Sequence, residues 1–190
     1  MSETWFYSDP HFFHEKIIEY CNRPFDNVKQ MNEAILENLN AVIKPKDFVY
    51  CLGDVFYWRI AFARMEAMFR LMPGRKFLII GNHDKMHQMK KLPWEWICQQ
   101  KEIRVKRQRI FLNHYAMRTW NHAFKGSWHL FGHSHGLLEP HGLSCPIDVD
   151  SWEFSPVHFD TITKLMRKLE SHTDQDDRDN KIWLGQEFSK

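Results

Sequence analysis

Short apolar runs that end in polar, chemically active residues recur along this chain. The clearest run, 77–80, is Phe-Leu-Ile-Ile, which is uninterrupted and too short for a helix, so it predicts a buried strand. Gly81 follows and allows a sharp turn. Asn82, His83 and Asp84 come next, at the tip of a strand, where α/β sheets bind their ligands. Taken alone, an ordinary polar turn explains this segment equally well.

The same arrangement is predicted at four further strand ends. We expect these strands over 5–8, 48–52, 110–112 and 128–131. The side chains that follow them are Asp9 and His11, Asp54, Asn113 and His114, and finally His133 and His135. A chance pattern would scatter Asp, Asn and His over helices and loops. The sequence therefore predicts a metal site along one edge of a sheet.

The remaining pattern predicts helices between these strands and after the last one. Helices are expected over 14–20, 28–44, 60–71, 85–91 and 159–169. Asn27 is the expected N-cap of the second helix, whose apolar face recurs at spacings of three and four from Met31 to Val42. The strands over 103–105 and 110–112 flank a basic turn and predict a hairpin, and a last strand is expected over 146–149.

Composition sets the size and polarity of the fold. The chain has 190 residues, of which 43% are hydrophobic, enough for a core without disulfide or metal staples. We predict one folded domain over residues 1–170 and a polar, flexible tail over residues 171–190. Basic residues number 26 against 24 acidic ones, so net charge gives no strong case for nucleic acid or membrane surfaces. The basic turn is more simply a solvated hairpin tip than a phosphate-binding patch.

The four cysteines indicate a reducing compartment. Cys21, Cys51, Cys98 and Cys145 are widely spaced, which fits free thiols better than a disulfide framework or a zinc finger. The first residues lack the basic and apolar regions of a signal peptide, and no apolar run approaches membrane length. We therefore expect a cytoplasmic protein that has no membrane partner.

A pair of divalent cations explains why these residue types meet at strand ends. Two such ions about 3.5–4 Å apart clamp the attacking and leaving oxygens of a phosphoryl displacement. The pair needs a shared anion, and Asp54, a lone carboxylate at its strand end, is the best candidate. The other predicted donors are Asp9, His11, Asn82, His114, His133 and His135.

These residues resemble the five motifs of the calcineurin-like metallophosphoesterases. In order, the motifs are Asp9-x-His11, Gly53-Asp54, Gly81-Asn82-His83-Asp84, His114 and Gly132-His133-x-His135. Each motif alone is weak or moderately specific, but the ordered set, spanning residues 4–150, is strong. The segments 7–12 and 20–25 are similar to the small bacterial and phage members of the family. Pro10 departs from that branch, which often has a small polar residue there, at a position that is not a ligand.

The resemblance implies an α/β fold, a four-layer α/β/β/α sandwich of two mixed sheets flanked by helices. It also implies two divalent metal ions, with Asp9, His11, Asp54 and His135 holding the first, and Asp54, Asn82, His114 and His133 holding the second. Manganese is our first expectation, with iron, zinc and nickel as alternatives, because a mixed His, Asp and Asn set suits these metals better than calcium.

The implied activity is hydrolysis of phosphodiester bonds in small or nucleotide substrates, by attack of a metal-bridging hydroxide. Phosphomonoesters are a second option. His83 would face the substrate and help the leaving oxygen depart. Asp84 would orient or charge-stabilise His83, or else cap the following helix. Asn22 and Arg23 are candidates for holding substrate phosphate or sugar. The equal alternative for Arg23 is an ion pair with a nearby acid.

Two other functions stay open. A metal-dependent nuclease acting on DNA or RNA is the first, although the short chain leaves no room for a separate nucleic-acid-binding domain. The second is a non-catalytic binding or scaffold protein on the same fold. Loss of catalysis usually leaves gaps in the metal set, and here every ligand position and His83 are present.

Overall fold

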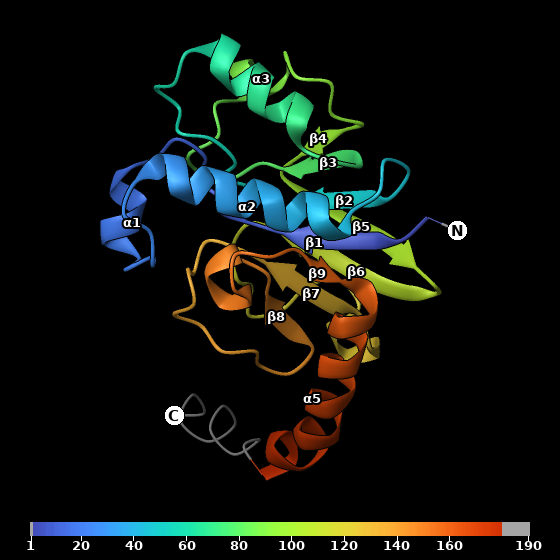
Figure 1. Cartoon of the computed structure of the whole chain (residues 1–190). Helices are drawn as coiled ribbons and strands as arrows, with labels where there is room; N and C mark the ends of the chain where they lie inside the picture. The colour runs from blue at the N-terminus through green and yellow to red at the C-terminus, as the bar shows by residue number, and fades with distance from the viewer. Residues whose placement is uncertain (1, 180–190) are drawn as a thin grey trace, which may run out of the picture.

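The structure is a computed structural model that describes residues 2–179, with side chains described through residue 169. Its strands are β1 (Thr4–Tyr7), β2 (Phe48–Cys51), β3 (Arg75–Ile79), β4 (Ile97–Cys98), β5 (Gln100–Val105), β6 (Gln108–Asn113), β7 (Trp128–Phe131), β8 (Ser144–Pro146) and β9 (Val157–His158). Its helices are α1 (Lys16–Tyr20), α2 (Val28–Val42), α3 (Phe62–Leu71), α4 (Met86–Met89) and α5 (Phe159–Asp179), with the 3₁₀ turns η1 (Ala123–Lys125) and η2 (Val149–Trp152). Figure 1 shows this order along the chain.

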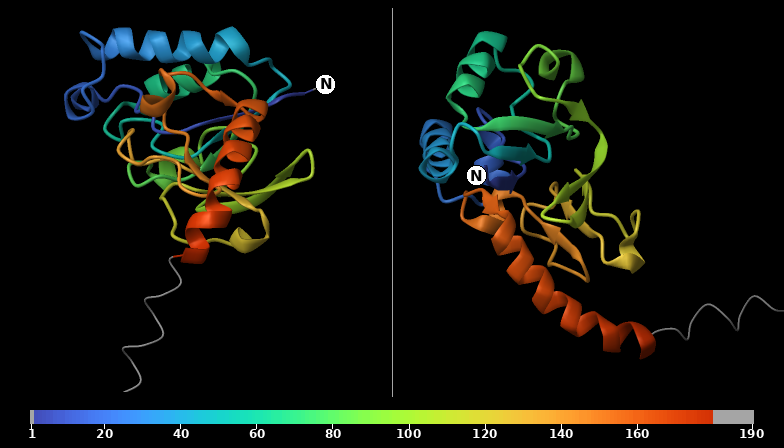
Figure 2. Two further views of the ribbon diagram at one scale, coloured as in Figure 1. Left: turned by 90° about the horizontal axis from the view of Figure 1, so that it is seen from below. Right: turned by 90° about the vertical axis from the view of Figure 1, so that its right-hand side faces the viewer.

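The strands form two mixed sheets. The five-stranded sheet has the order β4-β3-β2-β1-β9, in which β1 to β4 are parallel and β9 is antiparallel to β1. The four-stranded sheet has the order β5-β6-β7-β8, in which only the β5–β6 hairpin is antiparallel. With helices flanking these sheets, the predicted fold class is confirmed (Figures 1 and 2).

Alternate residues of the central strands enter two different cores. One core joins Cys51 and Leu78 of the five-stranded sheet to α2 and α3, through side chains such as Ile35 of α2. The other core contains Leu52 and Ile79, together with residues of the four-stranded sheet and of α5. Because successive strand residues point to opposite faces, a continuous apolar run is what a strand buried on both sides requires.

The registers bring the carboxyl ends of the parallel strands to one edge. Tyr7 pairs with Cys51 and Cys51 with Leu78, so the segments after β1, β2 and β3 leave the sheet together. Leu112 pairs with Leu130 in the same way in the second sheet. The two sheets are joined at this edge, where Val149 donates its N–H to the carbonyl oxygen of Ser8 at 2.9 Å.

Several predicted element boundaries differ from the structure. Asn27 is the N-cap of α2 as predicted, and its side chain accepts the Gln30 N–H at 2.9 Å. The helix ends at Val42, however, and not at residue 44. Val42 is 42% exposed, and Ile43, already in extended conformation, is buried in its place. The strand predicted over 146–149 corresponds to β8, which ends at Pro146 instead of Val149, because the side chain of Asp148 accepts the Ser151 N–H and starts η2.

The final helix is longer than predicted. It continues from Phe159 to Asp179 instead of stopping near residue 169. The segment 159–179 turns polar but contains no Gly or Pro, and polarity alone does not end a helix. The rest of the predicted tail, 180–190, lies outside the described residues. Within 2–179, no helix is both long and apolar enough to cross a membrane.

Candidate metal centre

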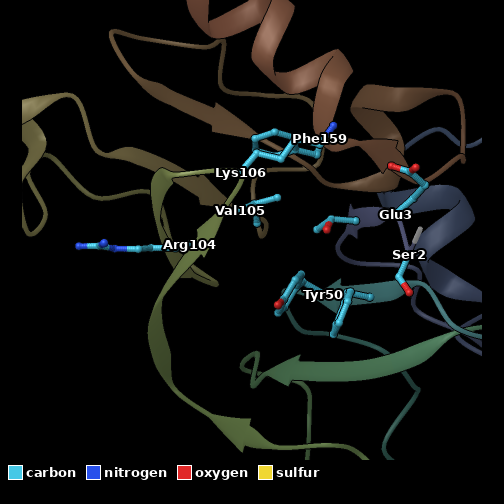
Figure 3. Close-up of a pocket in the computed structure, with 9 residues that line it drawn as sticks. Ser2, Glu3, Tyr50, Arg104, Val105, Lys106 and Phe159 are labelled. Atoms are coloured by element: carbon cyan, nitrogen blue, oxygen red, sulfur yellow. The ribbon is translucent and has the colours of Figure 1, made fainter.

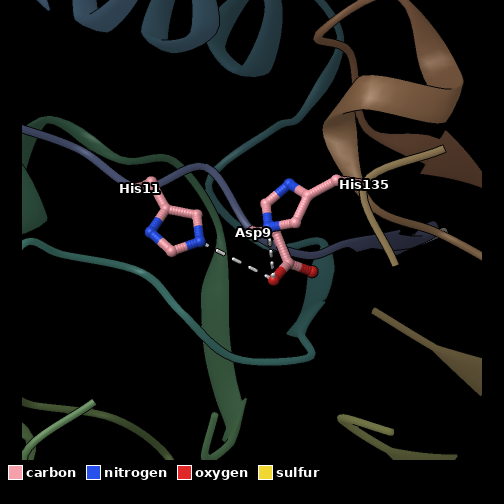
Figure 4. A group of neighbouring side chains, drawn as sticks. All are labelled: Asp9, His11 and His135. Carbon is pink, nitrogen blue, oxygen red and sulfur yellow. Dashed lines mark ion pairs between the residues drawn. The ribbon is translucent and has the colours of Figure 1, made fainter. Parts of the chain in front are cut away.

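The first group of predicted donors meets beyond β1. Nε2 of His11 lies 3.9 Å from Oδ1 of Asp9, and Nε2 of His135 lies 3.8 Å from the same oxygen. Figure 4 shows both rings turned toward this carboxylate, one from the segment after β1 and one from the segment after β7. These three side chains therefore offer two imidazole nitrogens and a carboxylate oxygen to one point.

The second group meets beside the first. Asp54, His114 and His133 each offer one donor atom within 4.8 Å of the others. Nε2 of His114 lies 2.9 Å from Oδ1 of Asn82, which brings the amide oxygen into the same group. Every residue predicted to hold a metal is thus in one of two adjacent groups.

Asp54 lies between the two groups. Its Oδ2 is 3.6 Å from Nε2 of His11 and 3.5 Å from Nε2 of His114. Its Oδ1 accepts the backbone N–H of His83 at 2.8 Å. One carboxylate therefore faces both groups of donors and also fixes the loop that carries His83.

The backbone at the donors is in the left-handed region. Positive φ angles occur at Asp9 (58°), His11 (49°), Asp54 (54°), His133 (68°) and His135 (46°). For residues with a side chain this conformation is disfavoured. It is found mainly at functional sites, where the surrounding structure holds it in place. Backbone hydrogen bonds help to hold this conformation: the N–H of Asp9 donates to the carbonyl oxygen of Gly53 at 3.0 Å, and the N–H of His11 donates to the carbonyl oxygen of Asp54 at 3.1 Å.

Two glycines make room for the carboxylates. A Cβ atom added at Gly81 would overlap the side chain of Asp54, and one added at Gly132 would overlap that of Asp9. This close approach is the physical reason why glycine precedes both Asn82 and His133.

The donor atoms fit a cation. Oδ1 of Asp9 and Nε2 of His11 are buried and have no hydrogen-bond partner, which is costly unless something else satisfies them. Burial is the main cause that raises the pKa of Asp9 and lowers the pKa of His11 well away from their usual values. Burial alone would lower the pKa of His135, but its hydrogen bond to Asp150, with smaller effects of Cys21 and Asp9, raises it to about 10. A raised pKa means that His135 holds its second proton tightly. A divalent cation among these atoms would replace that proton and would give Oδ1 of Asp9 and Nε2 of His11 the partner they lack.

Contacts behind the histidines fix their tautomers. Nδ1 of His114 lies 2.7 Å from the carbonyl oxygen of Leu52, and Nδ1 of His135 lies 2.7 Å from Oδ2 of Asp150. Both oxygens accept, so each Nδ1 carries the proton and each Nε2 can present its lone pair to a metal.

Two residues near the donors were missed by sequence reasoning. Asp150 directly follows the strand that the sequence predicts over 146–149, so the strand-end rule that found the other donors would also have found it. His14 has its Nδ1 3.4 Å from Nδ1 of His11, and its ring stacks on Tyr57 at 4.8 Å between centroids. His14 is predicted to begin a helix but lies just before α1, and nothing in that prediction points to this contact.

Asp84 has a different place from the one predicted. Its Oδ2 accepts the N–H groups of Asp54 and Gly81, each at 2.9 Å, and its Oδ1 accepts that of Val55 at 3.0 Å. Helix α4 has Lys85 as its N-cap and no side-chain cap bond. Burial, then the charge of Asp54, raises the pKa of Asp84 to about 6. Asp84 therefore supports the turn that carries Asp54. The prediction that it caps the following helix is wrong, whereas its predicted action on His83 stays a prediction.

Arg23 is also placed differently. Its buried guanidinium pairs with Asp150, Nε to Oδ1 at 2.7 Å, which is the ion-pair alternative. With its nitrogens turned inward, Arg23 is not available to a substrate phosphate in this structure. Asn22 is exposed and has a positive φ of 48°; its assignment to substrate stays a prediction.

His83 stands apart from both donor groups. Its half-buried ring lies 5.2 Å from that of His11, between centroids, and the groups of clustered donors among the described residues do not include it. This geometry is consistent with a role toward substrate instead of metal.

A cleft of about 320 Å³ lies elsewhere (Figure 3). It is lined by Ser2, Glu3, Thr4, Phe48, Tyr50, Arg104, Val105, Lys106 and Phe159. These residues include the starts of β1 and β2, whereas the donors follow the ends of those strands. The cleft is therefore separate from the candidate metal centre.

Two mixed sheets with Asp, Asn and His side chains gathered at one edge define an α/β protein with a candidate metal centre. The chain belongs to the calcineurin-like phosphoesterase family, whose model matches residues 3–189. The family implies metal-dependent hydrolysis of phosphoesters.

Two relatives and one solved structure are similar to most of this chain. The chain is 31% identical over 175 residues to the uncharacterised protein MJ1445 of Methanocaldococcus jannaschii, covering 88% of this chain and 93% of that one. It is 25% identical to the gene 66 protein of Mycobacterium phage D29, a match that covers 90% of this chain and 98% of that protein. A crystal structure of the protein of unknown function AQ665 from Aquifex aeolicus matches with a TM-score of 0.68 and 28% identity, covering 87% of this chain and 100% of that one.

Proposed function

We propose that this protein uses two divalent cations to hydrolyse phosphodiester bonds of small or nucleotide substrates, with phosphomonoesters as a second class. The observation that carries the proposal is the position of Asp54, whose Oδ2 lies 3.6 Å from Nε2 of His11 and 3.5 Å from Nε2 of His114. A carboxylate shared in this way lets two cations lie close together, because its charge offsets their repulsion.

The donors divide between the two cations as the family resemblance implies. Asp9, His11, Asp54 and His135 would hold the first, and Asp54, Asn82, His114 and His133 would hold the second. When bound, such a pair activates water and neutralises charge on the phosphoryl group. Manganese remains our first choice, ahead of iron, zinc and nickel, for a mixed set of nitrogen and oxygen donors.

The role of His83 follows from its tether and its exposure. Its backbone N–H is bonded to Oδ1 of Asp54, so the loop is held against the shared carboxylate. Its ring is only half-buried, which leaves it accessible to a substrate on the metals. In this proposal His83 donates a proton to the leaving oxygen, or stabilises the charge there.

An exposed aromatic ring beside the second group supports nucleotides among the substrates. Tyr115 is 47% exposed, and its ring lies 4.8 Å from that of His133, between centroids. A planar base that extends from the phosphate can stack on such a ring.

The nuclease alternative has less support. Lys106 and Arg109 of the basic hairpin are paired with Asp160 and Glu102, at 2.9 and 3.0 Å. Basic side chains that are already paired with carboxylates contribute less to a positively charged surface that could bind a phosphate backbone. Loss of catalysis usually leaves gaps in the donor set, and this set has none.

A substrate screen with each metal tests the proposal. Metal-free protein would be reconstituted with manganese, iron, zinc or nickel and assayed on aryl diesters, aryl monoesters, cyclic nucleotides, dinucleotides and oligonucleotides. We expect metal-dependent turnover that is highest on a small diester or dinucleotide. Highest activity on oligonucleotides with salt-sensitive binding would support the nuclease. Two bound metals without turnover of any substrate would support the non-catalytic protein.

A further inference from the structure

A buried ion pair lies directly behind the first group of donors. Nε and Nη2 of Arg23 donate to Oδ1 and Oδ2 of Asp150 at 2.7 and 2.8 Å, a two-point contact. The side chain of Arg23 is 0% exposed and that of Asp150 is 8% exposed. A planar guanidinium that meets both oxygens of a carboxylate fixes the direction of both groups.

The Arg23 guanidinium also holds the backbone next to two predicted ligands. Nη2 donates to the carbonyl oxygen of Asp9 at 2.8 Å, and Nη1 donates to that of Pro10 at 3.1 Å. Asp9 and His11 have positive φ angles of 58° and 49°. Bonds to the carbonyls of this segment therefore help to keep a disfavoured backbone in place.

The Asp150 carboxylate reaches a third predicted ligand. Its Oδ2 accepts the Nδ1–H of His135 at 2.7 Å, which turns Nε2 toward Asp9. His135 follows a strand of the four-stranded sheet, and Asp9 follows a strand of the five-stranded sheet. The Arg23–Asp150 pair thus connects donors that come from both sheets.

We propose that Arg23 and Asp150 are positioning residues that set the affinity of the first metal site, a role that rests on the two-metal function proposed above. Partners of this kind orient a ligating histidine and raise its basicity, and their loss typically costs 10–100-fold in metal affinity. Arg23 makes the arrangement tolerable, because a carboxylate buried without a partner would be costly.

The effect should be confined to the first site. His114 is held by the carbonyl of Leu52, and the hydrogen bonds of Arg23 and Asp150 reach no donor of the second group. Selective loss of one site therefore separates positioning from a general loss of structure.

The test is stepwise binding of Mn²⁺ to the metal-free full-length protein, measured by isothermal titration calorimetry. The variants are Asp150→Ala, Asp150→Asn and Arg23→Lys. We expect Asp150→Ala to weaken one of the two sites by about 10–100-fold and to leave the other unchanged. Asp150→Asn should lose less, because an amide oxygen still accepts the Nδ1–H of His135. Arg23→Lys should also weaken one site, since an ammonium cannot reproduce the two-point contact.

The matched control is Arg75→Lys. Arg75 makes a similar two-point contact with Glu95, at 2.9 and 3.2 Å, but this pair is exposed and lies at the start of β3, away from the donors. Both sites should keep wild-type affinity in this variant. The rise in melting temperature on adding Mn²⁺ gives a second readout that does not depend on activity.

The outcomes separate the two proposals. Failure of the unmodified protein to bind two ions overturns the proposed function itself. In the other case, the unmodified protein binds two ions while the folded variants keep wild-type affinity at both sites, or lose affinity equally at both. Either of these results overturns the positioning role alone. If Asp150→Ala does not fold, Asp150→Asn and Arg23→Lys decide by the same criteria.

Discussion

Oδ1 of Asp54 accepts the backbone N–H of His83 at 2.8 Å, while Oδ2 of the same side chain faces the donor nitrogens of His11 and His114. The residue predicted to bridge two cations therefore also fixes the loop that presents the predicted proton donor. A change at Asp54 should disturb both parts of the site, whereas a change in the ring of His83 should disturb only one.

The first prediction concerns the shared charge of Asp54. Asp54→Asn should lose at least one of the two metals and nearly all turnover, because a neutral amide no longer offsets the repulsion between the cations. Metal content by plasma mass spectrometry and turnover of an aryl diester measure both effects. Asp160→Asn, which removes an exposed carboxylate paired with Lys106, is the control and should behave as the unmodified protein. Full metal occupancy with near-normal turnover in Asp54→Asn would exclude the two-metal assignment.

The second prediction concerns the support of the Asp54 turn by Asp84. Its two oxygens accept three backbone N–H groups, and the amide nitrogen of Asp84→Asn cannot accept any. We expect this variant to lose about 1–3 kcal/mol of unfolding free energy and to bind metal more weakly. Urea unfolding of the metal-free protein and calorimetric metal binding test this. Intact stability and metal binding, with lower turnover alone, would instead favour a direct action of Asp84 on His83.

The strand ends and their donors were predictable because the information is local. A run such as 77–80 followed by Gly81 defines a buried strand and a turn within a few residues. Parallel pairing then brings the residues after β1, β2 and β3 to one edge without further information. The motifs identified the remaining donors by their order along the chain.

The partners of the charged residues were not predictable in this way. Arg23 and Asp150 are 127 positions apart, and only the closure of the two sheets brings them together. Asp84 is followed by a helix and resembles a cap in sequence, yet the backbone N–H groups of the Asp54 turn lie nearer to it. Local pattern gives the position of a side chain along the chain, but tertiary packing decides which neighbour it meets.

The third prediction concerns the thiols. All four cysteines are free in the structure, and they should all react with a thiol reagent after unfolding without reductant. In the folded protein the half-buried Cys21 and Cys98 should react first. Burial protects Cys51 and Cys145, and it raises the pKa of the Cys145 thiol to about 12. Mass spectrometry counts the added labels; a disulfide in protein purified without reductant would contradict the expected reducing compartment.

The fourth prediction concerns a buried carboxylate away from the metal centre. Asp47 accepts the N–H groups of Glu3 and Lys44, each at 2.9 Å, and Nε1–H of Trp5 at 3.3 Å. Burial alone would raise the pKa of Asp47, but these hydrogen bonds lower it below its usual value. With the folded pKa below the unfolded one, the stabilisation is fully present above the unfolded pKa of about 4 and is lost as the pH falls through the folded pKa.

Asp47→Asn should therefore lower the free energy of unfolding by about 1–3 kcal/mol at pH 7. The difference from the unmodified protein should narrow below pH 4. Urea unfolding of both proteins over a series from pH 7 to pH 3 gives this difference at each pH, with the exposed Asp26→Asn as the control. A difference that stays constant over the series would show that the charge of Asp47 does not contribute.

The last prediction concerns the ring of His83. His83→Ala should keep both metals, since the ring belongs to neither donor group, while turnover falls by about two to four orders of magnitude. The loss should be greatest for diesters with a poor alkoxide leaving group and smaller for nitrophenolate, which departs without a proton.

Metal stoichiometry and turnover on two diesters that differ only in leaving-group pKa measure these effects. His87→Ala, which removes an exposed histidine from the following helix, should change neither quantity. If His83→Ala loses metal, the ring is a ligand. If both substrates decline equally with metal retained, the ring does not act on the leaving group, because a proton donor must matter most where the departing oxygen is most basic.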